Sequence, residues 1–144
     1  MKIIIQDPRP GEEDSVVISV KHMSESVMRA IDILKSPEGL PVYTEDGATI
    51  LALTEIFYCE SVDLKTFIYA DKIVYRSRRK LYELEEILDE ADFLRISKQT
   101  ILNVKKIKSV APHDGGRFTA ILLNGEKLII SRQYVPALKE RFGL

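Results

Sequence analysis

The sequence is poor in the residues that build metal sites and disulfide frameworks. Among 144 residues it has one cysteine, Cys59, two histidines and no tryptophan. A lone cysteine excludes an internal disulfide, and one cysteine with His22 and His113 makes no cluster at metal-ligand spacing. We therefore expect no metal, no cofactor and a reducing compartment.

Long apolar runs are also missing. No run approaches the ~20 residues that a membrane-spanning helix needs. The first apolar run stops after three residues, which is too short for a signal peptide. With 45% hydrophobic and 30% charged residues, the composition is that of a globular domain able to bury a core. These features predict a cytoplasmic protein.

Signs of catalysis are weak. His113 lies beside Asp114 in the stretch PHDGGR and could serve as a base, but no nucleophile motif accompanies it. Gly115 and Gly116 precede a predicted strand rather than a helix, which is more typical of a turn than of a phosphate-binding loop. We expect no enzyme and no small-molecule substrate, and an enzyme that uses His113 ranks third among the hypotheses.

The net charge of −1 hides an uneven distribution. Residues 1–92 hold 11 Lys/Arg and 19 Asp/Glu, a net of −8, whereas residues 93–144 hold 10 and 3, a net of +7. A positive half attracts a phosphate backbone, and an acidic half is left to face solvent or a protein partner. The alternative is that the two halves attract each other within the fold.

The first 38 residues predict a small β-β-α unit. Residues 2–6 and 15–21 read as strands, and a helix follows from Ser24, a typical N-cap, until Pro37 and Gly39 end it. The apolar face of this helix consists of Val27, Ala30, Ile31 and Leu34. So small a unit needs to pack on the rest of the chain or on a second copy of itself, and we expect a dimerisation or regulatory role for it.

Residues 39–144 predict a domain dominated by short antiparallel strands. Asn124-Gly125 fits a type I′ turn in a terminal hairpin. The fold class is therefore mostly β with short helices (α+β). Strands are expected at residues 40–44, 48–53, 56–60, 66–70, 72–77, 117–123 and 127–130, and helices at residues 79–93 and 134–141.

Residues 93–103, with the sequence FLRISKQTILN, break this pattern. Four polar residues in a row interrupt an apolar segment, and the basic run VKKIK follows. A buried strand does not accept such an insertion, so a polar partner is expected to meet it. Basic side chains also gather at residues 76–80 and at Arg132, and such side chains contact phosphates and base edges. The sequence favours duplex DNA as partner; the alternative is solvated surface charge.

Five motifs occur in a recognisable order from about residue 41 to residue 144. They are ILALTEIFYCES, KTFIYA, KLYELEEIL, FLRISKQTILNVKKI and LNGEKLIISRQYVPALK. This order is similar to that of the LytTR family, the DNA-binding domains of bacterial LytR/AlgR-type transcription regulators. The resemblance implies an elongated antiparallel β domain at residues 39–144. It also implies loops that enter successive major grooves, commonly at paired direct repeats.

The resemblance assigns the DNA contacts to three segments. They comprise Asp63, Lys65 and Thr66 after IFYCES, then Ser97, Lys98 and Gln99 after Arg95, and finally Ser131, Arg132 and Gln133 after the last strand. Arg95, Lys105 and Lys106 complete the expected DNA-binding set. Asn103 either contacts DNA or bonds to a loop backbone. Lys98 and Gln133 depart from the residues common in the family, which leaves the base preference open, since Lys reaches guanine and Gln pairs with adenine.

The resemblance also implies partners. Most relatives carry a receiver domain before the LytTR domain, and only about 40 residues precede it here, so we expect the stand-alone form. The activity of such regulators is often set by a membrane-bound regulatory protein. We expect a transcription regulator that binds duplex DNA as a homodimer. The runner-up is a protein-interaction module that sequesters a partner through residues 1–38.

Overall fold

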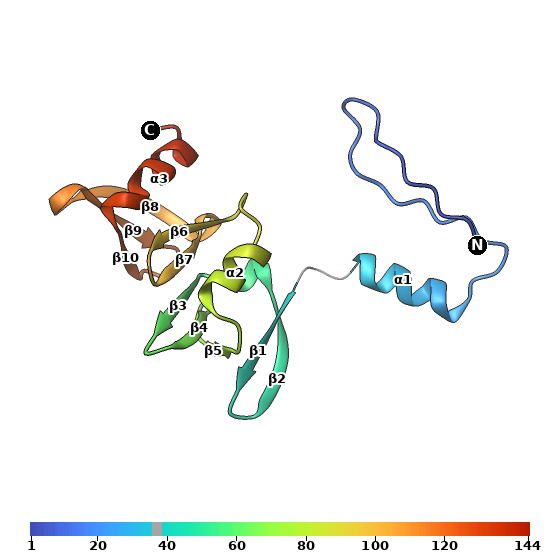
Figure 1. Cartoon of the computed structure of the whole chain (residues 1–144), viewed down its shortest axis with the longest axis horizontal. Helices are drawn as coiled ribbons and strands as arrows, with labels where there is room; N and C mark the ends of the chain where they lie inside the picture. Colours follow the sequence, from blue (N-terminus) through green and yellow to red (C-terminus); the bar gives the residue numbers. More distant parts are fainter. Residues whose placement is uncertain (36–38) are drawn as a thin grey trace. The chain divides into compact units, whose positions relative to one another are not determined.

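The chain forms two compact units, Met1–Ser36 and Pro37–Leu144 (Figure 1). The structure is a computed structural model that describes residues 1–35 and 39–144. The helix end expected at Pro37 lies outside the described residues. Within those residues, no helix is both long enough and apolar enough to cross a membrane.

The first unit contains two extended segments, residues 2–6 and 15–21, followed by α1 (Glu25–Lys35). The Ser24 hydroxyl accepts the N–H of Val27 at 3.2 Å, which confirms the predicted N-cap. The two predicted strands are wrong as strands, because no ladder of backbone hydrogen bonds joins the segments among the described residues. Within one copy of the chain, a hairpin of two strands without a third element to cover it is marginal in water.

The second unit contains a seven-stranded antiparallel sheet in the order β2-β1-β5-β4-β3-β7-β6. Its helix α2 (Leu81–Ile87) connects β5 to β6. The predicted hairpin and the meander that follows it are confirmed, with shifts of one or two residues at the strand ends. The strands are β1 (Gly39–Thr44), β2 (Gly47–Ala52), β3 (Tyr58–Val62), β4 (Lys65–Tyr69), β5 (Val74–Ser77), β6 (Phe93–Ser97) and β7 (Thr100–Asn103).

A three-stranded antiparallel sheet completes the unit, in the order β10-β9-β8. Its elements are β8 (Ile107–His113), β9 (Arg117–Leu122), β10 (Lys127–Ile130) and the C-terminal helix α3 (Val135–Phe142). The β9–β10 hairpin is confirmed, but the type I′ turn is wrong: Gly125 alone of the Asn124-Gly125 pair has a positive φ, and the Gly125 N–H donates to Leu122 O across a longer loop. The mostly β fold class with short helices is confirmed.

Two hydrophobic cores flank the β6–β7 hairpin. Phe93 and Ile101 belong to the core that α2 covers, whereas Ile96 and Leu102 belong to the core that α3 covers. Successive residues of a strand point to opposite faces, so a strand between two cores is apolar on both faces. All four residues of β7 are accordingly buried.

Asn103 is the polar residue that ends this buried strand. It is 3% exposed; its side-chain N–H donates to Ile56 O at 2.8 Å, and its Oδ1 accepts the N–H of Lys105 at 3.0 Å. Of the two roles left open by the sequence, the structure therefore supports bonding to a loop backbone.

We predict that Asn103→Ala lowers the free energy of unfolding by about 1–3 kcal/mol, because it leaves the buried carbonyl of Ile56 and the partly buried N–H of Lys105 without their partner. Denaturant titration measures the loss. Ser109→Ala, on an exposed position of β8, should stay within about 0.5 kcal/mol of the wild type. Equal stabilities for both variants would contradict a structural role for Asn103.

Cys59 on β3 is 0% exposed, and burial raises the pKa of its thiol to about 12. The thiolate is the reactive form, so at pH 8 the folded protein presents neither access nor charge to a thiol reagent. We predict that Ellman's reagent labels Cys59 only as fast as the chain unfolds, with the rate rising in denaturant. Rapid stoichiometric labelling of the native protein would contradict this.

Candidate nucleic-acid interface

Several loops of the second unit meet at one end of its two sheets. Pairing of β3 with β4 and β7 puts the β3–β4 turn beside the β6–β7 turn, since the Ser61 N–H donates to Gln99 O at 2.8 Å. The segment after β10 joins them, because the Ser131 N–H donates to Ile96 O at 2.8 Å. The structure thus brings together the three segments that the sequence singled out.

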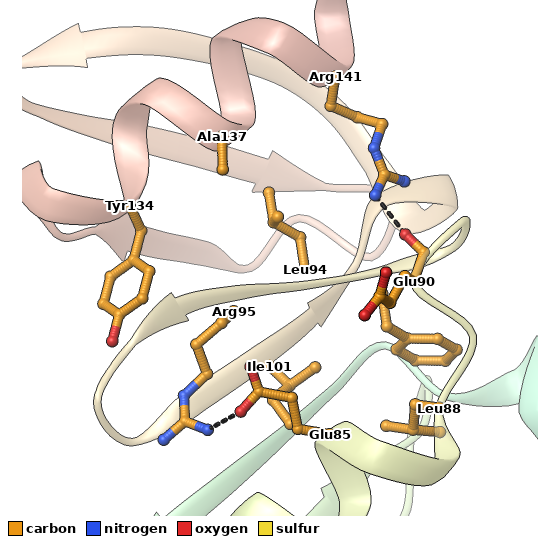
Figure 2. Close-up of a pocket in the computed structure, with 10 residues that line it drawn as sticks. Glu85, Leu88, Glu90, Leu94, Arg95, Ile101, Tyr134, Ala137 and Arg141 are labelled. Carbon is orange, nitrogen blue, oxygen red and sulfur yellow. Dashed lines mark hydrogen bonds and ion pairs between the residues drawn. The ribbon is translucent and has the colours of Figure 1, made fainter.

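The β6–β7 turn is held by the side chain of Arg95. Its guanidinium donates to the carbonyls of Ser97 at 2.8 Å and Lys98 at 2.5 Å, and pairs with the Glu85 carboxylate of α2 at 2.5 Å (Figure 2). Arginine suits this position because its planar fork of donors can serve several acceptors at once. Arg95 is half-buried, and hydrogen bonds within the chain use three of its five N–H donors, so its role in this structure is to position the turn.

A change of register at the end of β6 shapes the same turn. The pairing with β7 shifts between Arg95 and Ser97, which leaves Ile96 as the bulged residue with its side chain 1% exposed. Bulges turn a strand and redirect its side chains. Beyond the bulge, the Ser97 hydroxyl accepts the N–H of Gln99 at 3.2 Å, and the side chains of Lys98 and Gln99 are exposed.

The β3–β4 turn presents an unusual side chain. Asp63 and Leu64 both have positive φ values, 51° and 65°, which are costly for residues other than glycine. Leu64 is 87% exposed, and its carbonyl accepts a hydrogen bond from the Lys80 ammonium at 3.3 Å. Lys65 is exposed beside it, but Thr66 is 3% exposed. The expectation that the Thr66 side chain contacts DNA is therefore corrected, because it faces the protein interior.

The third segment, Arg132–Tyr134, is a single turn of 3₁₀ helix before α3. Arg132 and Gln133 are exposed, whereas Ser131 is half-buried. The stem of Arg132 lies against Gly116, where a Cβ would come within 2.9 Å of Arg132 Cδ. Gly116 also has a φ of 74°, so a side chain at this position would be strained and would displace Arg132.

Two expected contact residues lie elsewhere. Lys105 and Lys106 belong to a 3₁₀ turn, Val104–Lys106, at the opposite end of β7 from the Lys98–Gln99 turn. Lys105 pairs with Asp92 at 3.2 Å, and the Lys106 ammonium lies 5.0 Å from the centre of the Phe57 ring. The structure does not bring these lysines to the end where the loops meet.

Three further basic residues, which the predicted DNA-binding set omitted, lie at the same end as the contact loops. Thr66 pairs with Ser77, so Arg78, Arg79 and Lys80 follow β5 at the same end as the turns, and all three are exposed. The basic run at residues 76–80 was the signal for them, but only the strand pairing places them beside the contact loops. We call this end of the unit the loop face. It comprises Leu64, Lys65, Arg78, Arg79, Lys80, Lys98, Gln99, Arg132 and Gln133.

A cleft of about 350 Å³ lies behind the loop face, between α2, the β6–β7 hairpin and α3 (Figure 2). Arg141 of α3 donates to the backbone carbonyl of Glu90, while Arg95 reaches Glu85 from the other side. The cleft wall between them includes Leu94. Arg95 thus ties the hairpin to α2, and Arg141 ties α3 to the segment that follows α2.

The candidate base His113 makes one side-chain contact in the structure. His113 Nδ1 lies 3.3 Å from the Thr119 hydroxyl, an exposed pair across β8 and β9. Among the described residues, no group of three or more histidine, cysteine, aspartate or glutamate side chains is arranged to hold a metal ion. The loop face mainly presents exposed hydrogen-bond donors, which are the side chains of its lysine, arginine and glutamine residues.

Comparison with known proteins points to one family. Residues 46–143 match the LytTr DNA-binding domain. The sensory transduction protein LytT of Enterococcus faecalis is 28% identical over 141 residues, covering 94% of this chain and 58% of that protein. The transcriptional regulatory protein LytR of Staphylococcus aureus is 29% identical over 107 residues, covering 74% and 44%. The chain thus spans about half of the length of each of these two relatives.

A solved structure shares the fold. It is the LytTr DNA-binding domain of a putative methyl-accepting/DNA response regulator from Bacillus cereus, with a TM-score of 0.71 and 26% sequence identity. The match covers 76% of this chain and 100% of that one.

We predict that Arg95→Ala speeds hydrogen–deuterium exchange in the β6–β7 turn by about tenfold or more, because the carbonyls of Ser97 and Lys98 lose their shared donor. Mass spectrometry of peptides covering the turn measures the effect. Arg78→Ala is the matched control, since Arg78 lies 4.3 Å above the Tyr43 ring and should leave this turn unchanged. Unaltered exchange in the Arg95 variant would rule out the positioning role.

Proposed function

Since this chain belongs to the family of LytTR DNA-binding domains, we propose that its loop face binds duplex DNA sequence-specifically in the major groove. The observation that carries the proposal is the meeting of the three contact segments and the basic run 78–80 at one end of the unit. A surface that joins cationic and amide side chains suits a ligand with a phosphate backbone and polar base edges.

The shape of the loop face fits a groove. The major groove is about 12 Å wide and admits a two-stranded β-ribbon. The body of the β6–β7 hairpin is paired within the seven-stranded sheet, so only its turn can enter such a groove, and this turn exposes Lys98 and Gln99. Because Arg95 and the bulge at Ile96 hold the turn, the hairpin reaches the DNA already ordered and loses little entropy on binding.

The side chains of the loop face divide into two roles. Lys98, Gln99, Arg132 and Gln133 read base edges, because lysine and arginine reach guanine, and glutamine pairs with adenine. Lys65, Arg79 and Lys80 contact phosphates, which supplies affinity and a strong dependence on salt concentration. Ser97 and Ser131 shape the backbone of the contact segments through their hydrogen bonds.

Leu64 adds an apolar contact to this polar surface. A leucine that is 87% exposed at the tip of a strained turn has no packing reason to be there. In the major groove an apolar side chain recognises the C5-methyl group of thymine. Leu64 is therefore a further side chain of the loop face that the sequence analysis missed, because nothing in the sequence predicts the positive φ values of this turn.

At the level of the cell, we propose a bacterial transcription regulator that acts in the cytoplasm as a homodimer on repeated half-sites. The regulator role rests on the names of relatives such as LytR of Staphylococcus aureus. The competing role, a protein-interaction module that uses residues 1–38, predicts no retention on heparin or duplex DNA at low salt. The DNA-binding role predicts retention that salt reverses.

We predict that Arg132→Ala lowers affinity for a specific duplex site by about tenfold or more, because one base contact is worth about 1–3 kcal/mol of discrimination. The site comes from selection against random DNA, and gel shift measures binding. Circular dichroism should show an intact fold, since Arg132 is exposed.

Lys127→Ala is the charge-matched control for Arg132. Lys127 is exposed at the start of β10, at the opposite end of that strand from Ser131. Its loss should weaken binding slightly and equally for all sequences. Equal affinities of the Arg132 variant and the wild type for the selected site would remove Arg132 from the proposed contacts.

A further inference from the structure

The N-terminal unit leaves most of its large apolar side chains uncovered. Within residues 15–21, Val16 is 66% exposed, Ile18 40% and Val20 44%, and Val17 on the other side of the segment is 85% exposed. Soluble monomers rarely expose a contiguous apolar patch of more than a few hundred Å². These are β-branched residues, which favour strands, so the surface calls for a partner that binds an extended chain.

The backbone of residues 15–21 is also free to pair. Among the described residues, the backbone hydrogen bond recorded in the extended region runs from the Glu12 N–H to Arg9 O at the turn, and none joins residues 15–21 to another segment. An extended chain with open N–H and C=O groups is a template for strand addition. Residues 15–21 hold no proline, whereas Pro8 and Pro10 follow residues 2–6 and interrupt that edge.

The sequence of this segment is complementary to itself. In an antiparallel pair centred on Ile18, Ile18 faces Ile18 of the second copy and Val16 faces Val20, so one face of the pair is apolar throughout. The acidic run at residues 12–14 comes before the segment, and Lys21 ends it. The same pairing therefore brings the acidic end of each copy to the basic end of the other, at both ends.

The charge of the unit also favours a copy of the same chain. Residues 1–36 hold five Lys/Arg and six Asp/Glu, a net of −1. Such a unit does not repel its own copy, and it carries no basic excess that would attract nucleic acid or an anionic membrane. A second copy of the same chain would cover the apolar face, pair with the open backbone groups and match the charge pattern.

We propose that residues 15–21 of two copies pair as antiparallel strands about a two-fold axis at Ile18, and that this pairing makes the chain a dimer. A two-fold interface uses the same patch on both subunits, which the self-complementary segment provides. The inference rests on the proposed function in one respect: the dimer brings two loop faces to paired half-sites.

A charge-exchange experiment on the full chain tests the axis. Ile18→Lys places two lysines against each other, and Ile18→Glu places two glutamates together. The dimer dissociation constant of each variant alone should therefore be about 100-fold or more above that of the wild type. Mixing the two variants should restore a dimer, since lysine then faces glutamate. Sedimentation equilibrium measures all three samples. The restored mixed dimer is an outcome that loss of folding would not produce.

Ile50→Lys provides the matched control. Ile50 is 66% exposed on β2 of the second unit, and its replacement should leave the dimer intact. A wild-type monomer at micromolar concentration would overturn the proposal. A dimer unchanged by Ile18→Lys, or variants that stay monomeric when mixed, would overturn it as well.

DNA binding is measured separately on one and two half-sites. Ile18→Lys should keep its affinity for a single half-site and lose about tenfold or more of its affinity for the pair. If the wild type bound no duplex, the proposed function would fail while the sedimentation result still decided the dimer. The two proposals therefore fail independently.

Discussion

The β6–β7 hairpin packs between two hydrophobic cores, and the loop face depends on this constraint. Phe93 and Ile101 fill one core while Ile96 and Leu102 fill the other, so the hairpin has no free face along its length. Burial of several such side chains at about 1.5–3 kcal/mol each holds the hairpin in place far more firmly than any surface contact. Polar side chains can then project only where the hairpin leaves the cores, at the Lys98–Gln99 turn.

The β6–β7 turn is rigid because the hairpin that carries it is packed in this way. Hydrogen bonds and an ion pair fix the turn and the two neighbouring contact segments to the hairpin. Arg95 leaves the sheet at the last paired position before the bulge and fastens two turn carbonyls to the Glu85 carboxylate of α2. The Ser61–Gln99 and Ser131–Ile96 hydrogen bonds attach the two neighbouring segments to the same hairpin. A recognition site on rigid elements keeps its side chains within reach of the same base edges. Moving the hairpin would therefore move all three contact segments together.

The sequence predicted the features that depend on a local pattern of residues. Alternation and turn residues placed the β1–β2 and β9–β10 hairpins. Helical spacing predicted α2, although this helix ends at Ile87 and not at residue 93. The position of each strand decided the rest: Thr66 faces inward because it lies on the same face of β4 as the buried Ile68, and Lys105 lies at the far end of β7. β8 escaped notice because KSVAPH mixes lysine, proline and histidine with few apolar residues. The two N-terminal strands met every local criterion, yet a strand needs a hydrogen-bonded neighbour, which local sequence does not supply.

The symmetry of the proposed dimer bears on how DNA half-sites are arranged. A two-fold axis through Ile18 relates the two copies by rotation, and rigid two-fold dimers bind inverted half-sites. The resemblance to LytTR regulators implies direct repeats, which require the two loop faces to point the same way along the duplex. Direct repeats are compatible with the dimer only if the second unit turns independently of the first. The contacts within each half-site are the same in both cases, because every residue of the loop face belongs to the unit Pro37–Leu144. The orientation of selected half-sites thus reports on the connection between the units, while their base sequence reports on the loop face.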